Sequence, residues 1–143
     1  MSLFRAKRGQ RGFTMMELMV VVVIVGVLAA VAVPLYGKYI KNARMTEATG
    51  RIGEIVTAAK AYAQEHQNED GDPVWPPAKG GGLVDLSATE NFKYSITAGG
   101  EKTATDNAFS VTAEGQNKMD GVKVVVTVPD INSNGNPPTV TGL

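Results

Sequence analysis

The pattern of hydrophobic and polar residues first predicts one long helix. A continuous apolar run reaches from Leu18 to Val33. The segment 13–36 around it is long enough to cross the roughly 30 Å hydrocarbon core of a bilayer as a helix. In residues 37–65 the apolar residues instead recur at spacings of three and four, which is typical of an amphipathic helix. They form one apolar stripe: Ile52, Ile55, Val56, Ala59 and Ala63. A helix over 13–65 would be about 80 Å long, so its first half must be covered by lipid or by other copies of the chain.

After residue 65 the pattern indicates a long loop followed by strands. Residues 66–91 are rich in proline and glycine, and Trp75 is expected to anchor this loop by packing rather than to bind a ligand. Alternation with period two predicts three strands, at 92–97, 108–113 and 122–128. The apolar face of this meander needs a cover, which the stripe on the second half of the helix supplies. We predict an α+β fold in which a long N-terminal helix packs against an antiparallel sheet of about three to four strands, with an irregular tail over 129–143.

Two residues weaken the apolar helix. Gly26 lies in its middle and Pro34 near its outer end, where the proline removes a helix hydrogen bond and favours a kink. In lipid the main chain must still satisfy its own hydrogen bonds, so the segment stays helical there. Between Gly26 and Pro34 we leave two interpretations open: tolerated residues in a membrane helix, or a segment that can melt locally.

Charge is distributed unevenly although the whole chain is neutral. The leader, residues 1–12, carries four basic side chains and no acidic one, and the rest of the chain has a net charge of −4. A mildly acidic body argues against a nucleic-acid surface. The basic flank is expected inside the cell and the bulk of the chain outside. This topology fits both an uncleaved anchor and a leader that is cleaved after Gly12.

Composition and isolated polar residues exclude several kinds of site. The chain has no cysteine, which excludes disulfides, thiolate metal sites and cysteine nucleophiles. His66 is the one histidine and lies near a predicted helix end, where a solvated role is expected. We recognise no catalytic set, and we expect neither enzymatic activity nor a cofactor.

Glu17 is the unusual residue of the N-terminal segment. It places a carboxylate at the start of the apolar run. An ionised carboxylate in hydrocarbon costs several kcal/mol, so such residues usually have a partner. A functional interpretation must therefore supply that partner for Glu17.

The N-terminal third resembles the type IV pilin and pseudopilin family. The matching residues are the basic leader ending in Gly12, then Phe13-Thr14, Glu17 as the fifth residue after that glycine, Leu18, and Pro34 near the end of the apolar run. The resemblance implies a prepilin peptidase that cuts between Gly12 and Phe13 and methylates the new amine of Phe13. It also implies that the mature chains stack their helices into a filament.

In such a filament, the resemblance implies that Glu17 pairs with the ammonium of Phe13 on a neighbouring copy. Removing one partner of a buried pair leaves an unpaired charge and costs about 3–5 kcal/mol, so the pair would fix the register between copies. Members of the family also often lose helicity between the positions of Gly26 and Pro34 on assembly. The expected partners are other copies of the chain, the peptidase, the membrane before assembly and the assembly machinery of the inner membrane.

The chain departs from many type IV pilins because no disulfide can close its C-terminal region. Residues 130–135 read D-x-N-x-N-G, the start of a calcium loop, with Asp130, Asn132 and Asn134 as candidate ligands. The twelfth position of an EF-hand loop would be Thr141 instead of glutamate, so that match fails. We expect no metal.

These observations predict a structural subunit of a type IV pilus, located in the inner membrane as a precursor and on the cell surface after assembly. A pseudopilin of a type II secretion system shares the same N-terminal chemistry and is the close alternative. A minor pilin that primes assembly and a monomeric membrane-anchored sensor are the other interpretations. Filaments that act in adhesion, twitching motility, DNA uptake and secretion share this N-terminal motif, so the motif alone does not distinguish between these functions.

Overall fold

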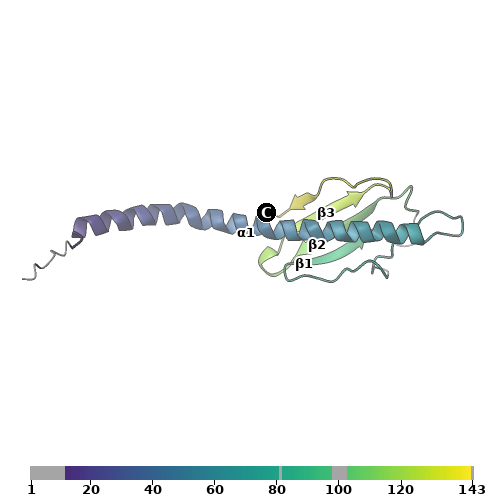
Figure 1. Cartoon of the computed structure of the whole chain (residues 1–143), viewed down its shortest axis with the longest axis horizontal. Coiled ribbons are helices and arrows are strands. Elements are labelled where there is room, and N and C mark those ends of the chain that lie inside the picture. The colour runs from purple at the N-terminus through teal and green to yellow at the C-terminus, as the bar shows by residue number, and fades with distance from the viewer. Residues whose placement is uncertain (1–11, 81, 98–102, 143) are drawn as a thin grey trace, which may run out of the picture. The chain divides into compact units, whose positions relative to one another are not determined.

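The computed structural model describes residues 12–80, 82–97 and 103–142. These residues form one α-helix, α1 (Met15–Glu65), and the strands β1 (Phe92–Thr97), β2 (Phe109–Gly115), β3 (Lys123–Val128) and β4 (Thr139–Thr141), with a short 3-10 helix, η1 (Asn117–Met119) (Figure 1). The chain divides into two compact units, residues 1–39 and 40–143, and α1 contributes to both. Residues 1–11, most of the expected leader, lie outside the described part.

The first unit consists of the apolar part of α1. By length and composition, α1 is the helix in the described part of the chain that could cross a membrane, and none of its apolar window is buried. Its large side chains are exposed, for example Leu18 at 60% and Leu28 at 64%. The helix continues through Gly26 and Pro34. Loss of helicity between these two residues on assembly therefore stays a prediction.

The second unit is built on a four-stranded antiparallel meander. The strand order β1-β2-β3-β4 follows the sequence, so each strand pairs with its neighbour along the chain. The connection from β2 to β3 passes through η1 and folds back tightly. Gly115 permits this close approach, because a Cβ there would overlap the main-chain carbonyl of Met119.

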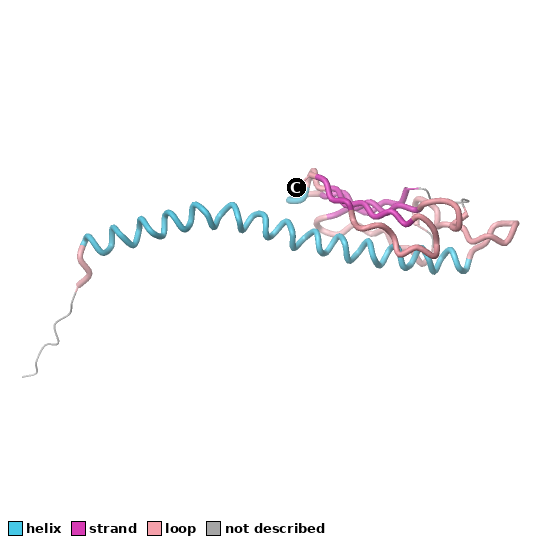
Figure 2. The backbone as a smooth tube through the Cα atoms, turned by 90° about the horizontal axis from the view of Figure 1, so that it is seen from above, coloured by secondary structure: helices cyan, strands magenta, loops and turns pink. Residues whose placement is uncertain are grey.

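One face of the sheet packs against the second part of α1, forming two layers (Figure 2). The inward residues alternate along the strands, as the burial of Phe92, Tyr94 and Ile96 in β1 shows. The helix presents a buried stripe with three alanines: Ala48, Ile52, Ile55, Ala59 and Ala63. Alanine side chains let the helix lie close to the sheet, while the isoleucines fill the layer between them.

The structure confirms the α+β class and the helix-on-sheet arrangement. β1 has the predicted bounds, and β2 and β3 each begin one residue later than predicted. The tail, residues 129–143, is not irregular throughout, because β4 pairs with β3 through Val140 and Val124. A strand of three residues is too short to give a periodic signal in the sequence.

Trp75 anchors the loop at residues 66–91, as predicted. Its side chain is 1% exposed and stacks on Phe109, with ring centroids 4.8 Å apart. Its indole Nε1 donates a hydrogen bond to the main-chain oxygen of Asn107 at 2.7 Å. Val84 is also buried, whereas Leu83 is 52% exposed and does not help to hold the loop.

Candidate functional site

The candidate site is the N-terminal end of α1, where Thr14 and Glu17 form a capping box. Thr14 lies just before the helix, and its main-chain N–H and hydroxyl both donate to Glu17 Oε2 at 2.9 Å. In return, the Glu17 N–H donates to the Thr14 hydroxyl at 3.2 Å. These bonds satisfy donors that the first turn of a helix otherwise leaves unpaired. The negative side chain also lies at the positive end of the helix dipole.

The capping box leaves part of the Glu17 carboxylate available. Both donors from Thr14 go to Oε2, and Oε1 accepts no hydrogen bond from the described residues. A shallow hollow of about 360 Å³ lies beside it, lined by Phe13, Met16, Glu17, Val20 and Val21. The site therefore consists of one carboxylate oxygen at the edge of an apolar surface. It is suited to a cationic group that is attached to an apolar side chain.

The predicted cleavage point lies directly before the helix. Gly12 and Phe13 are exposed and outside regular secondary structure. Apart from the residues next to Gly12 in the chain, no described residue has an atom within 4 Å of the position a Cβ would take there. A peptidase needs an accessible, extended main chain, which a residue inside α1 would not offer. The structure thus brings Phe13 and Glu17 together at one end of the helix and keeps the Gly12–Phe13 bond accessible.

Sequence reasoning missed the role of Thr14. Glu17 was expected to need a partner from another molecule, whereas in this structure the chain supplies donors of its own. The signal was present, because Thr-x-x-Glu directly before an apolar run is the sequence signature of a capping box. Thr14 therefore joins Phe13 and Glu17 as a site residue.

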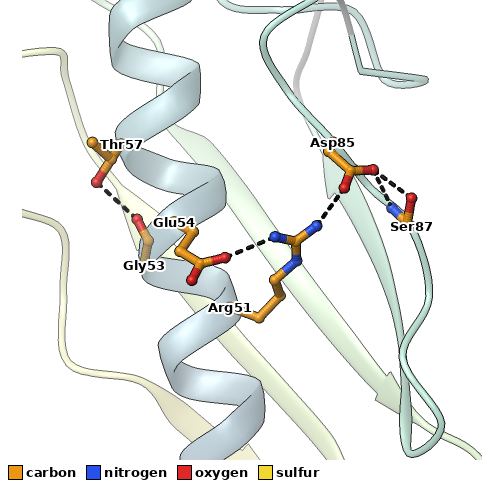
Figure 3. Close-up of polar contacts among 6 residues, drawn as sticks. All are labelled: Arg51, Gly53, Glu54, Thr57, Asp85 and Ser87. Atoms are coloured by element: carbon orange, nitrogen blue, oxygen red, sulfur yellow. Dashed lines mark hydrogen bonds and ion pairs between the residues drawn. The ribbon is translucent and has the colours of Figure 1, made fainter.

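In the second unit, Arg51 links α1 to the loop that precedes the sheet. Its guanidinium donates to Glu54 at 2.7 Å and to Asp85 at 2.6 Å, as Figure 3 shows. These two hydrogen bonds, first the one to Glu54 and then the one to Asp85, raise the pKa of Arg51. Hydrogen bonds from Ser87, and then the one from Arg51, hold the pKa of the Asp85 carboxyl below its ordinary value. The carboxylates are largely exposed, so this network positions the loop and adds little stability.

Tyr94 presents an unpaired hydroxyl beneath this region. The residue is 3% exposed, and its hydroxyl makes no hydrogen bond with the described residues. Thr89 lies near it without the geometry of a normal hydrogen bond. Burial raises the pKa of the Tyr94 phenol. A buried phenol that gains no hydrogen bond is a cost to the fold.

The candidate calcium residues belong to a turn that is closed by its own hydrogen bonds. Asp130 Oδ1 accepts from the main-chain N–H groups of Asn132 at 2.8 Å and Ser133 at 2.9 Å. Lys60 of α1 donates to the carbonyl of Ser133. Among the described residues, no group of three or more His, Cys, Asp or Glu side chains is placed to hold a metal ion.

His66, directly after α1, contacts Tyr62 in the last turn of the helix. Its ring stacks on Tyr62 with centroids 3.8 Å apart, and its Nδ1 lies 3.0 Å from the Tyr62 carbonyl oxygen. These contacts agree with the expected role at a helix end.

Comparison with known proteins connects the N-terminal geometry to a family. Residues 7–33 match the family described as the prokaryotic N-terminal methylation motif. The chain is 32% identical over 117 residues to fimbrial protein EcpC of Eikenella corrodens, covering 82% of this chain and 71% of that protein. It is 32% identical over 127 residues to prepilin peptidase-dependent protein D of Escherichia coli (strain K12), covering 88% and 77% respectively. No solved structure is significantly similar to the chain.

The motif and the relatives agree with the structure over different parts of the molecule. The methylation motif covers the capping box and the exposed apolar part of α1. The relatives extend the similarity through most of the second unit, in which the helix packs on an antiparallel meander. The chain belongs to the type IV pilin and pseudopilin family.

Proposed function

We propose that this chain is the structural subunit of a type IV pilus, a filament assembled by stacking copies of α1 after removal of the leader. The observation that carries the proposal is a carboxylate with one free oxygen, Glu17, at the start of an uncovered apolar helix and four residues after an accessible Gly12–Phe13 bond. The name of the EcpC relative, a fimbrial protein, supports the same function. The chain has no reaction of its own in this proposal.

Processing creates the charge that assembly uses. Prepilin peptidase cuts between Gly12 and Phe13 and the new amine of Phe13 is methylated, which leaves a positive charge on an aromatic residue. The name of the second relative, a prepilin peptidase-dependent protein, supports this step. Before assembly the precursor sits in the inner membrane, with Glu17 satisfied by Thr14.

During assembly, the ammonium of Phe13 on one copy pairs with Glu17 of its neighbour. The free Oε1 receives the ammonium, and the apolar hollow beside it receives the attached side chain. Contact between the exposed apolar surfaces replaces contact with lipid. Because an unpaired charge in such a core costs about 3–5 kcal/mol, only registers that pair each Glu17 are populated.

Two measurements test the proposal. Mass spectrometry of the mature chain should find an N-terminal methylated Phe13, and a chain that starts at unmodified Met1 would refute it. Electron microscopy of sheared cell-surface fractions should find filaments that contain this subunit. Short filaments confined to the periplasm would instead indicate the pseudopilin function.

The Glu17→Gln variant separates processing from assembly. It keeps the size and part of the hydrogen bonding of the side chain but removes its charge, so we expect normal cleavage and loss of filaments. Glu114→Gln is the matched control, because Glu114 lies exposed on the sheet and forms only a 3.5 Å surface pair with Lys123. Wild-type filament yield from Glu17→Gln would contradict the role given to its charge.

A further inference from the structure

A hollow of about 600 Å³ lies beside the C-terminal end of α1, within the unit formed by residues 40–143. Its lining combines aromatic rings, carboxylates and amides: Tyr62, Trp75, Glu69, Asp70, Gln67 and Asn68. The Tyr62 ring is half-buried and held in place by its stacking on His66. An aromatic wall beside carboxylates is suited to a cationic side chain.

Glu69 and Asp70 line this hollow, and further acidic side chains lie on neighbouring loops of the same unit. The hydrogen bonds from Ala104 to Pro73 and from Ile131 to Ala104 join three loops at this end of the unit. Six carboxylates lie on these loops and on the last turn of the helix: Glu65, Glu69, Asp70, Asp72, Asp106 and Asp130. None of them forms an ion pair with another described residue. The last turn of α1 contains no basic residue to offset the negative end of the helix dipole.

The opposite end of the same unit carries basic side chains that are also free of ion pairs. Lys41 and Arg44 lie where α1 enters the unit, and the ion pairs among described residues involve neither of them. The helix between Arg44 and Glu65 spans roughly 32 Å at 1.5 Å per residue. The two charged ends therefore cannot meet within one copy.

We propose that the acidic end of one copy, with its hollow, receives Lys41 and Arg44 of a second copy. This contact rests on the proposed filament function and adds to it a head-to-tail interface between the second units. Such an interface joins two different surfaces and can propagate from copy to copy as an open helix. The Arg44 guanidinium can lie against the Tyr62 ring while it pairs with the carboxylates of Glu69 and Asp70.

Charge reversal at each end tests the pairing. Glu69→Lys with Asp70→Lys places like charges at the interface, and so does Lys41→Glu with Arg44→Glu. Because like charges across an interface oppose association, each pair of changes should lower the yield of sheared filaments by about tenfold or more. The combination of all four changes restores opposite charges and should recover most of the yield.

The controls reverse exposed charges on the outward face of the sheet, at residues that are not part of the proposed contact. Lys93→Glu and Glu114→Lys should leave filament yield unchanged. Cleavage of the leader and the amount of each variant in the membrane are measured alongside, so that a folding defect is recognised. Equal losses from the control and end variants, or no recovery in the four-change variant, would overturn the head-to-tail pairing.

Crosslinking gives a second readout that does not depend on yield. The natural chain has no cysteine, so Arg44→Cys with Asp70→Cys introduces the one pair of thiols. Oxidised filaments should give a ladder of covalent multimers, whereas Lys93→Cys with Asp70→Cys should give none. Wild-type filaments with no ladder from the first pair would overturn the interface and leave the proposed function standing. Absence of wild-type filaments would instead refute the proposed function itself.

Discussion

Replacing Trp75 by alanine should release the loop at residues 66–91 from the sheet. The indole is almost completely buried, stacks on Phe109 and donates a 2.7 Å hydrogen bond to the Asn107 carbonyl. It therefore joins the loop to β2 by packing on Phe109, and to the segment before β2 by the hydrogen bond to Asn107. We expect Trp75→Ala to be among the most destabilising single changes in this unit.

The magnitude follows from the buried area and the lost hydrogen bond. A tryptophan buries about 150–250 Å², which at about 25 cal/mol per Å² corresponds to roughly 4–6 kcal/mol. Measured costs of Trp→Ala changes are about 3–5 kcal/mol because the surroundings partly collapse. Small domains are stable by about 5–15 kcal/mol, so the variant should lose a large share of its stability.

Urea unfolding of the full chain in detergent, followed by circular dichroism, measures this loss. Fluorescence is unsuitable because Trp75 is the sole tryptophan of the chain. Trp75→Phe is the matched control: it keeps an aromatic ring against Phe109 but leaves the Asn107 carbonyl without its donor. We expect it to cost about 1–3 kcal/mol, clearly less than alanine.

Two results would refute this reasoning. A loss below about 1 kcal/mol for Trp75→Ala would mean that the loop is held elsewhere, because ordinary surface changes stay within about 0.5 kcal/mol. Equal losses for phenylalanine and alanine would mean that the hydrogen bond dominates and that ring packing contributes little.

Three further predictions concern the same unit, and all are measured by urea unfolding. Gly115→Ala should destabilise the fold by about 1–3 kcal/mol or more, because its methyl group meets the main chain that leaves η1. Tyr94→Phe should leave stability unchanged or raise it by up to about 1 kcal/mol, because the hydroxyl lost is buried without a partner among described residues. The third concerns pH: Ser87 and Arg51 lower the pKa of Asp85 in the folded state. The contribution of the Asp85 carboxylate to the stability of the fold is therefore complete above the pKa of aspartate in the unfolded chain, about 3.9. This contribution is lost as the pH falls through the lower pKa of Asp85 in the folded state. Stability should fall less steeply in Asp85→Asn than in the natural chain when pH is lowered from about 5.

Each of these predictions has a contrary result. An unchanged midpoint of urea unfolding for Gly115→Ala would show that the turn can move away from the added methyl group. A large loss in Tyr94→Phe would mean that the hydroxyl has a partner such as ordered water. Parallel pH profiles for Asp85→Asn and the natural chain would show that the network with Arg51 does not act on stability.

Periodicity was sufficient to predict the main elements because burial and sequence pattern coincide in them. The helical stripe from Ile52 to Ala63 faces the sheet, and the alternation in residues 92–97 places Phe92, Tyr94 and Ile96 inside. β4 could not be predicted this way, since three residues give no period. Its position depends on the free edge of β3, which is a tertiary feature.

The candidate site was predicted in part. The order of Gly12, Phe13 and Glu17 was sufficient to predict the family, whose methylation motif matches residues 7–33. The cleavage and assembly roles of the three residues stay predictions. The contribution of Thr14 is local and was available from its spacing to Glu17. That the loops carrying Asp106 and Asp130 join the loop after α1 could not be predicted, because these loops are distant in the sequence and meet only in the folded unit.

The meander also sets the order in which the fold can form. Each ladder joins strands that are neighbours in the chain, so the loop-closure entropy of each pairing is small and the sheet can form stepwise. The step of longest range is docking of the finished sheet onto the stripe between Ala48 and Ala63. When the chain emerges N-terminus first, this stripe is made before the strands that cover it. The chain must therefore pass through a stage with an uncovered amphipathic helix, when association with other chains competes with folding.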